Sequence, residues 1–523
     1  MSPSRERGVS ALASRGTPNV WRRVWGWFAR LSRAERIFIG LVILCYTYFL
    51  QPGGTNTFSR YDMVSALSNG SAIIDGYAAN TIDVSVYHGH FYSPRSIGLS
   101  LLATPVLRAL RALHLVAGAR VTEPRTVGMT IAVLNLCTVV PAAIAAVIIF
   151  ERFILRLRPE LRGTSAPIVA AGAFGLCTLF FPMSTEFYSH AFAGALAFAG
   201  FYLLYRAKSA ARAGWLVAVA GALVGFAIIS EYPVGVIMLA LAAYTWVSFP
   251  ARSRRMLLIF AAGMLPGALA LGWYNWFAFG NPLHLSYEFV AGRQFAGQHT
   301  GLFGITYPRL GAYWQLLVYP RGLLVESPFL IFLPVGFYRW FRSRRRPPAE
   351  ALVCLAVAVL YPTMIAGYYL PMAGENLPGP RLLVPALPFA CLALAWVVDD
   401  VRRGVRAVFA ALLAVGALLS FLYVAAGVRE DHTRLTYPLT GLYWPILSTG
   451  VVPRLDSPTP PTLTTALFHA PTLVSVYFAL IPLLAGLAWA IWALVRGVDA
   501  GRPAPVATRT RLVGVEPVAN TVV

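Results

Sequence analysis

Long apolar runs separated by clusters of arginine are the feature that most constrains the fold of this 523-residue chain. Each run is roughly 17–25 residues long, which is the length that an α-helix needs to cross the hydrocarbon core of a bilayer. Hydrophobic residues make up 58% of the sequence and charged residues only 12%, far below the charged fraction of a soluble domain. We therefore expect an all-α polytopic membrane protein.

The arginine clusters indicate which loops face the cytoplasm, because Lys and Arg collect in cytoplasmic loops. Their regular placement also explains the net charge of +22 without a nucleic-acid partner. With the clusters inside, both termini are predicted to be cytoplasmic, and all eight histidines fall at the opposite face. This threading predicts about twelve transmembrane helices, at approximately 36–52, 127–150, 166–182, 189–205, 214–230, 232–249, 256–278, 322–338, 350–367, 382–398, 405–427 and 471–495.

The same threading divides the chain into three parts. A basic cytoplasmic tail (1–35) precedes the transmembrane domain (36–495), and a disordered cytoplasmic tail (496–523) follows it. Two extracytoplasmic loops, 52–126 and 279–321, are too long to be simple connectors. The five cysteines lie in apolar runs and have no spacing typical of a disulfide framework or a metal site.

The first long loop carries the densest set of chemically versatile side chains. Its segment 59–98 reads SRYDMVSALSNGSAIIDGYAANTIDVSVYHGHFYSPRSIG. Acids, bases and aromatic groups concentrated at one membrane face indicate a reaction or a ligand there. A short helix is expected around 62–68, and the apolar but arginine-bearing stretch 97–115 is expected to lie along the membrane interface as an amphipathic helix. The candidate site residues in the segment are Arg60, Asp62, Asp75, Asp83, His88, His90, Tyr92 and Arg95.

Further acids stand at the outer ends of predicted spans. A carboxylate just inside lipid is costly unless it is paired or lines a watery cavity, so several at one depth indicate a shared cavity. Helix capping or hydration among the headgroups is the alternative for each one. These acids are Glu186 in STEFYSH, beside His190, Glu231 in SEYP, and Glu288, Glu326 and Glu375.

Two arginines of the outer face follow Gly or Pro at the start of apolar segments, Arg95 in FYSPRSIG and Arg381 in NLPGPRLLVP. Because a guanidinium holds phosphate oxygens in a fixed bidentate geometry, the pair suits a lipid-linked phosphate. The alternative is an arginine that snorkels or pairs with an acid. His88-Gly-His90 is a weak metal signal without a third ligand, and hydrogen bonding to a sugar or an acid is favoured. We predict no metal and no cofactor.

Several segments together resemble the GT-C superfamily of membrane glycosyltransferases, especially its branch of protein O-mannosyltransferases and the aminoarabinose transferase of lipid A. They include SRYD, IDGY, GHFYS, EFYSHA, SEYP, FGNP, YPRGLL and GPRLLVPALP, between about residues 59 and 388. The resemblance implies a catalytic aspartate in the first outer loop, for which Asp62 is the nearest match, with Asp75 and Asp83 as alternatives. This chain has Arg95 where the family usually has Lys, and it lacks the family's acidic pair before the first interfacial helix.

We therefore expect a bacterial plasma-membrane enzyme of the cell envelope, an inverting hexosyl- or pentosyltransferase that acts on the extracytoplasmic face. The donor would be a polyprenyl-phosphate-linked sugar, and the acceptor a glycolipid, polysaccharide or protein. Donor phosphate would bind Arg95, Arg381 and Arg60, whereas sugar or acceptor would contact His88, His90, Tyr92, Glu186, His190 and Glu231. The alternative is a transporter or flippase of lipid-linked saccharides, which an inverted repeat and helices broken at the midplane would favour.

Overall fold

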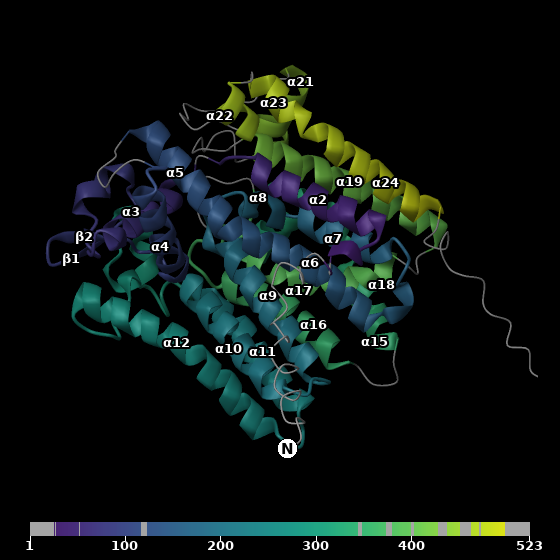
Figure 1. Ribbon diagram of the computed structural model, residues 1–523, viewed down its shortest axis with the longest axis horizontal. Coiled ribbons are helices and arrows are strands. Elements are labelled where there is room, and N and C mark those ends of the chain that lie inside the picture. The colour runs from purple at the N-terminus through teal and green to yellow at the C-terminus, as the bar shows by residue number, and fades with distance from the viewer. Residues whose placement is uncertain are drawn as a thin grey trace, which may run out of the picture.

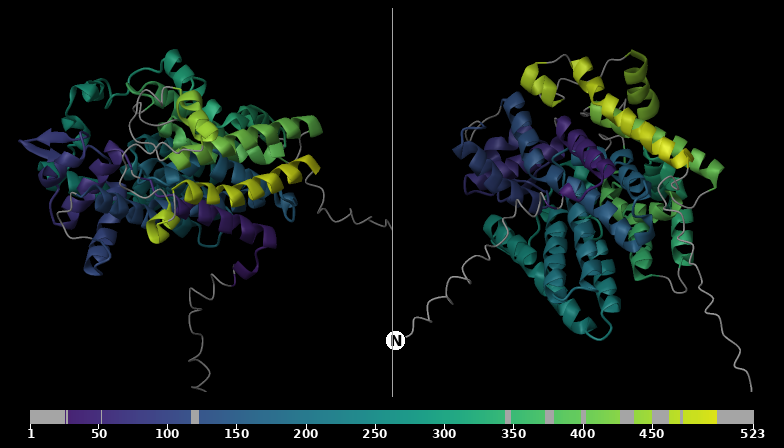
Figure 2. Two further views of the ribbon diagram at one scale, coloured as in Figure 1. Left: turned by 90° about the horizontal axis from the view of Figure 1, so that it is seen from above. Right: turned by 45° about the vertical axis from the view of Figure 1, so that its right-hand side comes forward.

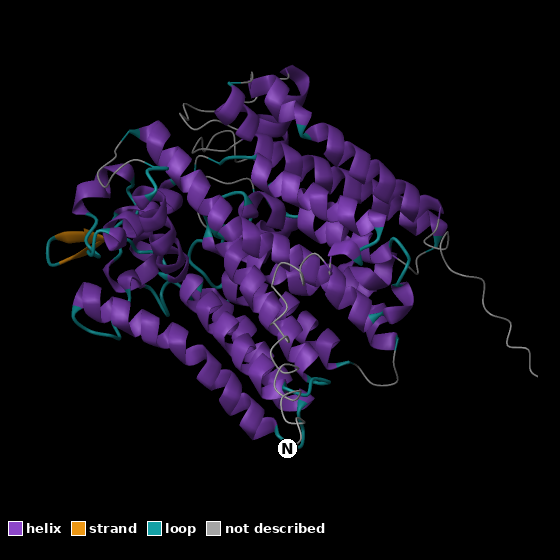
Figure 3. Cartoon of the chain, viewed as in Figure 1, coloured by secondary structure: helices purple, strands orange, loops and turns teal. Residues whose placement is uncertain are grey.

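The computed structural model describes Gly26 and residues 28–496, apart from gaps at 52, 117–122, 344–347, 373–378, 399–401, 427–436, 450–461 and 470–471. Almost all regular structure in these residues is helical (Figure 3). Most of the two expected tails and the sequence candidate Glu375 lie outside the described residues.

Long apolar helices form the body of the molecule (Figure 1). Within the described residues, six helical stretches are long and apolar enough to cross a membrane, as expected of a multi-pass membrane protein. They are the pair α5 (Pro124–Cys137) and α6 (Val139–Leu157), α10 (Ala213–Ser230), α12 (Ser253–Phe279), α16 (Ala349–Ala366), the stretch Arg381–Val398, and Gly404–Ala425 within α19 (Arg403–Ala426).

Other helices account for the remaining expected spans, so that each of the twelve falls on a helix or on a run of short helices. How many of them cross a membrane stays a prediction. The helices are α2 (Arg33–Tyr48), α7 (Ala166–Cys177), α8 (Phe180–Ser184), α9 (Ser189–Ala207), η3 (Tyr232–Val234), α11 (Gly235–Ser248), α14 (Leu323–Glu326), η6 (Pro328–Phe332), α15 (Leu333–Arg342), α23 (Thr472–Phe478) and α24 (Leu480–Arg496).

The first long loop folds at one end of the bundle, at the left of Figure 1, whereas α15 and the end of α6 lie at the other end. The two ends are also separate in both views of Figure 2. Segments of the second long loop, η4 and η5, contribute short 3-10 helices, and η4 pairs with β1. The elements outside the expected spans are α3 (Thr55–Ser68), η1 (Asp75–Asn80), β1 (Ser85–Tyr87), β2 (His90–Tyr92), α4 (Gly98–Ala112), η2 (Pro159–Leu161), η4 (Ser286–Phe289), η5 (Arg293–His299), α13 (Leu310–Leu317), η9 (Leu439–Tyr443), α21 (Trp444–Thr449) and α22 (Leu463–Phe468).

A two-stranded hairpin departs from the all-α expectation. Strands β1 and β2 pair antiparallel, with Tyr87 opposite His90. The turn residues His88 and Gly89 both have positive φ, 50° and 83°, as in the type I′ turns that suit the twist of a hairpin. The helix α3 is also longer than expected, because it begins at Thr55 rather than near Asp62.

Close glycine contacts hold α10 against α12. A Cβ atom added at Gly221 would stand 2.1 Å from the carbonyl oxygen of Phe260, and one at Gly263 would stand 2.2 Å from that of Ala218. Gly225 and Gly267 also meet across this interface, so each helix contributes a G-x-x-x-G pair. Small residues of this kind let two membrane helices approach until their backbones touch.

The stretch Arg381–Val398 runs through the middle of the bundle, and 89% of it is buried. It consists of η7 (Arg381–Ala386), α17 (Leu387–Cys391), η8 (Leu392–Leu394) and α18 (Ala395–Val398). Gly194 of α9 packs directly on Pro385, where an added Cβ atom would stand 2.8 Å from the proline Cα. This stretch therefore has a fixed place beside α9 and sets the position of Arg381 at its first residue.

Candidate active site

Arg60 ties three parts of the hairpin end together. Its side chain is buried, with 2% of its surface exposed. Nε donates to Asn56 Oδ1 at 3.1 Å, Nη1 to the Ser96 carbonyl oxygen at 3.0 Å, and Nη2 to Ser189 Oγ at 2.7 Å. These bonds reach α3, the segment before α4 and the first residue of α9. Arg60 therefore holds these three segments in a fixed arrangement around its buried side chain.

Glu231 continues this network at the end of α10. The Ser189 hydroxyl donates to Glu231 Oε2 at 2.5 Å, and His190 Nδ1 lies 3.1 Å from the same oxygen. All three side chains are buried. A carboxylate buried at this depth is stable only when partners compensate its lost hydration, and here a hydroxyl, an imidazole and the nearby charge of Arg60 do so.

Buried Asp83 and half-buried Arg95 form an ion pair. Arg95 donates from both Nε (2.5 Å) and Nη2 to the single oxygen Oδ2 of Asp83. The other oxygen, Oδ1, is buried and has no hydrogen-bond partner among the described residues. Burial and the positive charge of Arg95 both lower the pKa of Arg60, so the two guanidiniums are neighbours. The arrangement gives an oriented carboxylate with one free acceptor oxygen beside two positive charges.

Arg381 lies over the ring of Tyr188, with its Cζ 5.1 Å from the ring centroid. Nη1 stands 3.4 Å from the Tyr188 hydroxyl, and Nε has no hydrogen-bond partner within the described residues. Burial raises the pKa of Tyr188 to about 12, while the charges of Arg381 and Arg95 lower it. Tyr188 therefore lies within electrostatic reach of both arginines.

Glu186, two residues before Tyr188, is buried near Arg381. Burial raises the pKa of Glu186 to about 8, although the charge of Arg381 lowers it. The structure thus brings together seven of the residues predicted from the sequence: Arg60, Asp83, Arg95, Glu186, His190, Glu231 and Arg381.

Asp62 occupies a different environment on α3. Its side chain is fully buried, and Oδ1 accepts a hydrogen bond from Asn80 Nδ2 at 2.9 Å. Burial raises the pKa of Asp62 to about 8, and the bond from Asn80 lowers it only in part. The carboxyl group is therefore mostly protonated at neutral pH, and within the described residues it makes no ion pair.

The remaining predicted residues belong to the hairpin and its support. Half-exposed Asp75 and His90 form a pair at 2.8 Å, and Asp75 also accepts the Phe91 amide hydrogen at 2.7 Å. His88 stacks on Tyr87, with ring centroids 4.1 Å apart. Tyr92 packs in the core against Phe279 at 5.1 Å. These contacts stabilise the hairpin, and none of them joins the cluster around Arg95 and Arg381.

Sequence reasoning missed three members of the network, Tyr188, Ser189 and Asn80. Tyr188 and Ser189 lie inside the quoted motif EFYSHA, where the acid and the histidine drew attention instead. Asn80 follows the IDGY motif and carries no charge, so no local pattern marks it as the partner of Asp62. Within the described residues, no three His, Cys, Asp or Glu side chains converge as ligands of one metal ion.

Comparisons with known proteins found similarities among solved structures. No protein-family model and no curated protein matches the chain. Among solved structures, ArnT from Cupriavidus metallidurans bound to undecaprenyl phosphate is 13% identical, with a TM-score of 0.46 over 92% of this chain and 77% of ArnT. The Archaeoglobus fulgidus oligosaccharyltransferase AglB, in complex with an inhibitory peptide and a dolichol-phosphate, is 12% identical, with a TM-score of 0.40 over 90% of this chain and 56% of AglB.

At this identity and TM-score no residue role transfers from either protein to this chain, and the GT-C resemblance of the sequence motifs stays a prediction.

Proposed function

We propose that this protein is an inverting glycosyltransferase that moves a sugar from a polyprenyl-phosphate-linked donor to an envelope acceptor on the extracytoplasmic face. The observation that carries the proposal is the oriented Asp83 carboxylate, whose Oδ2 accepts from Arg95 and whose Oδ1 has no partner among the described residues. Arg381 belongs to the same region, because its charge and that of Arg95 both act on Tyr188. A lipid-linked donor needs a phosphate contact, a proton acceptor and apolar helices beside its tail. The hairpin end of the bundle offers a candidate for each of these three requirements.

Arg381 is proposed as the principal phosphate ligand. Stacking on Tyr188 orients its guanidinium plane, and its free Nε lets it bind two oxygens of one phosphate. Arg95 bonds to Asp83 through Nε and Nη2, so its Nη1 is left for a phosphate oxygen. Arg60 is already engaged by Asn56, Ser96 and Ser189, and its proposed part is to position the others.

Asp83 is proposed as the general base, ahead of Asp62 and Asp75. The acceptor hydroxyl would attack the anomeric carbon and give its proton to Asp83 Oδ1, while the bond between that carbon and the phosphate oxygen breaks. Its electron pair leaves with the polyprenyl phosphate, whose added negative charge the arginines stabilise. Asp62 is protonated near neutral pH and Asp75 is tied to His90, so neither is as well prepared to accept a proton.

The experiment uses purified full-length protein with a panel of polyprenyl-phosphate sugars and scores the polyprenyl phosphate released. Asp83→Asn should reduce turnover about 10²–10⁴-fold, the usual worth of a general base. Asp75→Asn, at the exposed start of η1 beside the hairpin, is the matched control and should retain most of the turnover. Because Asp83→Asn also removes half of an ion pair, its unfolding midpoint is measured alongside, and Asp83→Glu tests whether a carboxylate restores activity.

Two outcomes would contradict the proposal. Release of lipid phosphate from no donor in the panel would argue against the reaction class. Full turnover by a folded Asp83→Asn protein would move the base elsewhere, with Asp62, then Glu231 and Glu186, as the next candidates.

A further inference from the structure

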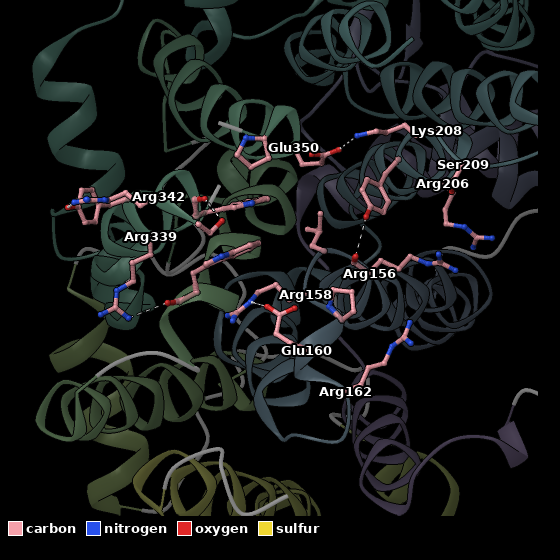
Figure 4. A pocket seen from close by; sticks show the side chains of 18 residues that line it. Arg156, Arg158, Glu160, Arg162, Arg206, Lys208, Ser209, Arg339, Arg342 and Glu350 are labelled. Carbon is pink, nitrogen blue, oxygen red and sulfur yellow. Dashed lines mark hydrogen bonds and ion pairs between the residues drawn. The ribbon is translucent and has the colours of Figure 1, made fainter. Parts of the chain in front are cut away.

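A cavity lies at the end of the bundle opposite the hairpin. Its volume is ≈ 860 Å³, which is within the range of small-molecule sites. Figure 4 shows its lining, which comes from the last residues of α6 and α9, the segment 158–162, α15, the start of α16, and Trp396 of α18. These segments are far apart in sequence, so the fold gathers them around one space.

The lining is strongly basic. Its two carboxylates already have partners: Glu160 accepts from Arg158 Nε at 2.9 Å, and Glu350 accepts from Lys208 Nζ at 2.7 Å. The Tyr244 hydroxyl donates to the same Glu350 oxygen at 2.8 Å. The described lining carries a formal net charge of +5, because it has two carboxylates and seven basic side chains: Arg156, Arg158, Arg162, Arg206, Lys208, Arg339 and Arg342.

Several of these guanidiniums are held in place by the protein itself. Arg158 donates to the Ala395 carbonyl oxygen at 2.8 Å and lies 5.5 Å from the centroid of the Trp396 ring. That ring stacks on buried Trp340, with centroids 4.2 Å apart. Arg342 donates to the Tyr338 hydroxyl at 2.7 Å and lies over its ring. Cations fixed on rigid aromatic walls lose less side-chain freedom when an anion binds.

The preference of cytoplasmic loops for Arg and Lys accounts for basic residues at this end, but not for their arrangement. Like charges on separate loops repel and would turn toward water. Here the described lining gathers seven basic side chains and two carboxylates around one cavity. A concave site lined by one sign of charge concentrates counter-ions of the other sign.

We propose that this pocket binds a phosphate-bearing anion. Arginine forks match phosphate oxygens, and the tyrosines and tryptophans of the lining are typical of the depth at which lipid headgroups lie. The phosphate would come from an anionic lipid headgroup of the adjacent leaflet or from a soluble phosphate compound. The inference does not depend on the proposed transferase activity at the other end.

The test measures the unfolding midpoint of the full chain in neutral phosphatidylcholine nanodiscs at physiological salt. One arm includes cardiolipin in the nanodiscs, and the other adds soluble inorganic pyrophosphate. A bound ligand raises the midpoint as its concentration exceeds its Kd. A shift with cardiolipin alone identifies the lipid headgroup as the source, and a shift with pyrophosphate alone identifies a soluble phosphate. Either result supports the proposal, and a shift with neither probe overturns it.

Two double variants distinguish binding in the pocket from non-specific attraction by surface charge. Arg162→Gln/Arg206→Gln removes two charges from the lining and should weaken binding about tenfold or more. Arg254→Gln/Arg255→Gln removes two exposed charges at the start of α12, outside the pocket, and should bind like the wild type. Unfolding midpoints without ligand show whether each variant folds. If Arg162→Gln/Arg206→Gln does not fold, the single variant Arg162→Gln replaces it in the test. Equal weakening by the two double variants would contradict a built site.

Discussion

The two most buried aspartates of the first long loop differ in the partners that compensate their lost hydration. This difference predicts how the stability of the protein depends on pH. Asp83 has the two bonds from Arg95, whereas burial raises the pKa of Asp62 from its ordinary 3.8 to about 8. Between those pH values the folded protein keeps a proton that the unfolded chain has released. The free energy of unfolding contributed by Asp62 therefore falls as pH rises from about 4 to 8.

Asp62→Asn should flatten this decline, because the amide has no proton to lose. Unfolding midpoints measured between pH 5 and 9 check the prediction. In Asp75, hydrogen bonds from His90 and Phe91 lower the pKa in spite of partial burial. Asp75→Asn should thus leave the slope between pH 5 and 9 unchanged, because the stability that this carboxylate contributes is lost only at more acid pH, where it becomes protonated. An unchanged slope in Asp62→Asn would show that Asp62 is ionised in the folded protein.

Arg381→Lys should weaken donor binding about tenfold or more although the charge is kept. An ammonium neither stacks on Tyr188 nor offers two parallel donors to one phosphate. Binding of a polyprenyl phosphate to the purified variant measures the loss. Arg108→Lys is the matched control, because Arg108 binds the Leu67 and Ser68 carbonyl oxygens outside the cluster. Equal affinities in both variants would exclude Arg381 as the phosphate ligand.

At the residue scale, the sequence indicated which face carries the site but not the pairing within it. The position of Asp62 in its motif favoured it as the catalytic base. Its pKa, however, depends on the burial of its side chain and on the bond from Asn80, and no local sequence pattern reveals either. The Asp83–Arg95 pair joins residues twelve positions apart across the hairpin, and the hairpin itself was not expected. Long-range contacts decide which carboxylate is oriented, and one sequence alone does not display them.

At the element scale, the contact between α10 and α12 predicts a stability defect. Gly221→Ala places a methyl group 2.1 Å from the Phe260 carbonyl oxygen, so the helices must separate, at an expected loss of about 1–3 kcal/mol. Gly235→Ala is the control, because nothing lies within 4 Å of its added Cβ atom. Unfolding midpoints in detergent compare the two. A Gly221→Ala protein as stable as the control would show that the helices separate freely.

The positions of the helices were predictable because apolar length is a local property, whereas their interruptions were not. The expected span 127–150 is divided by a break at Thr138 between α5 and α6. The expected span 322–338 contains α14, η6 and the first part of α15, with Pro328 at the first position of η6. Such breaks depend on packing partners elsewhere in the chain as well as on proline.

For the whole molecule, the charge pattern predicts that the hairpin end and the basic pocket lie on opposite sides of the membrane. A cysteine at Ser71 should react with an impermeant reagent from outside intact cells, and one at Ser343 only after the cells are opened. Cys137→Ser provides the background, because Cys137 is the exposed cysteine and the other four are buried. Labelling of both positions from the same side would overturn the topology and the extracytoplasmic placement of the reaction.

The helix α9 begins with Ser189 and His190 in the candidate site and carries Arg206 in the basic pocket at its other end. Sixteen residues of α-helix separate His190 from Arg206 by about 24 Å. The stretch Arg381–Val398, packed against α9 at Gly194, likewise joins Arg381 to Trp396. The helix α9 and the stretch Arg381–Val398 thus both run from one end of the bundle to the other. A displacement of α9 along its axis at the pocket would therefore also move Ser189. If the basic pocket binds a lipid headgroup as proposed, we expect such a displacement to couple the occupancy of that pocket to the candidate site at the other end of α9.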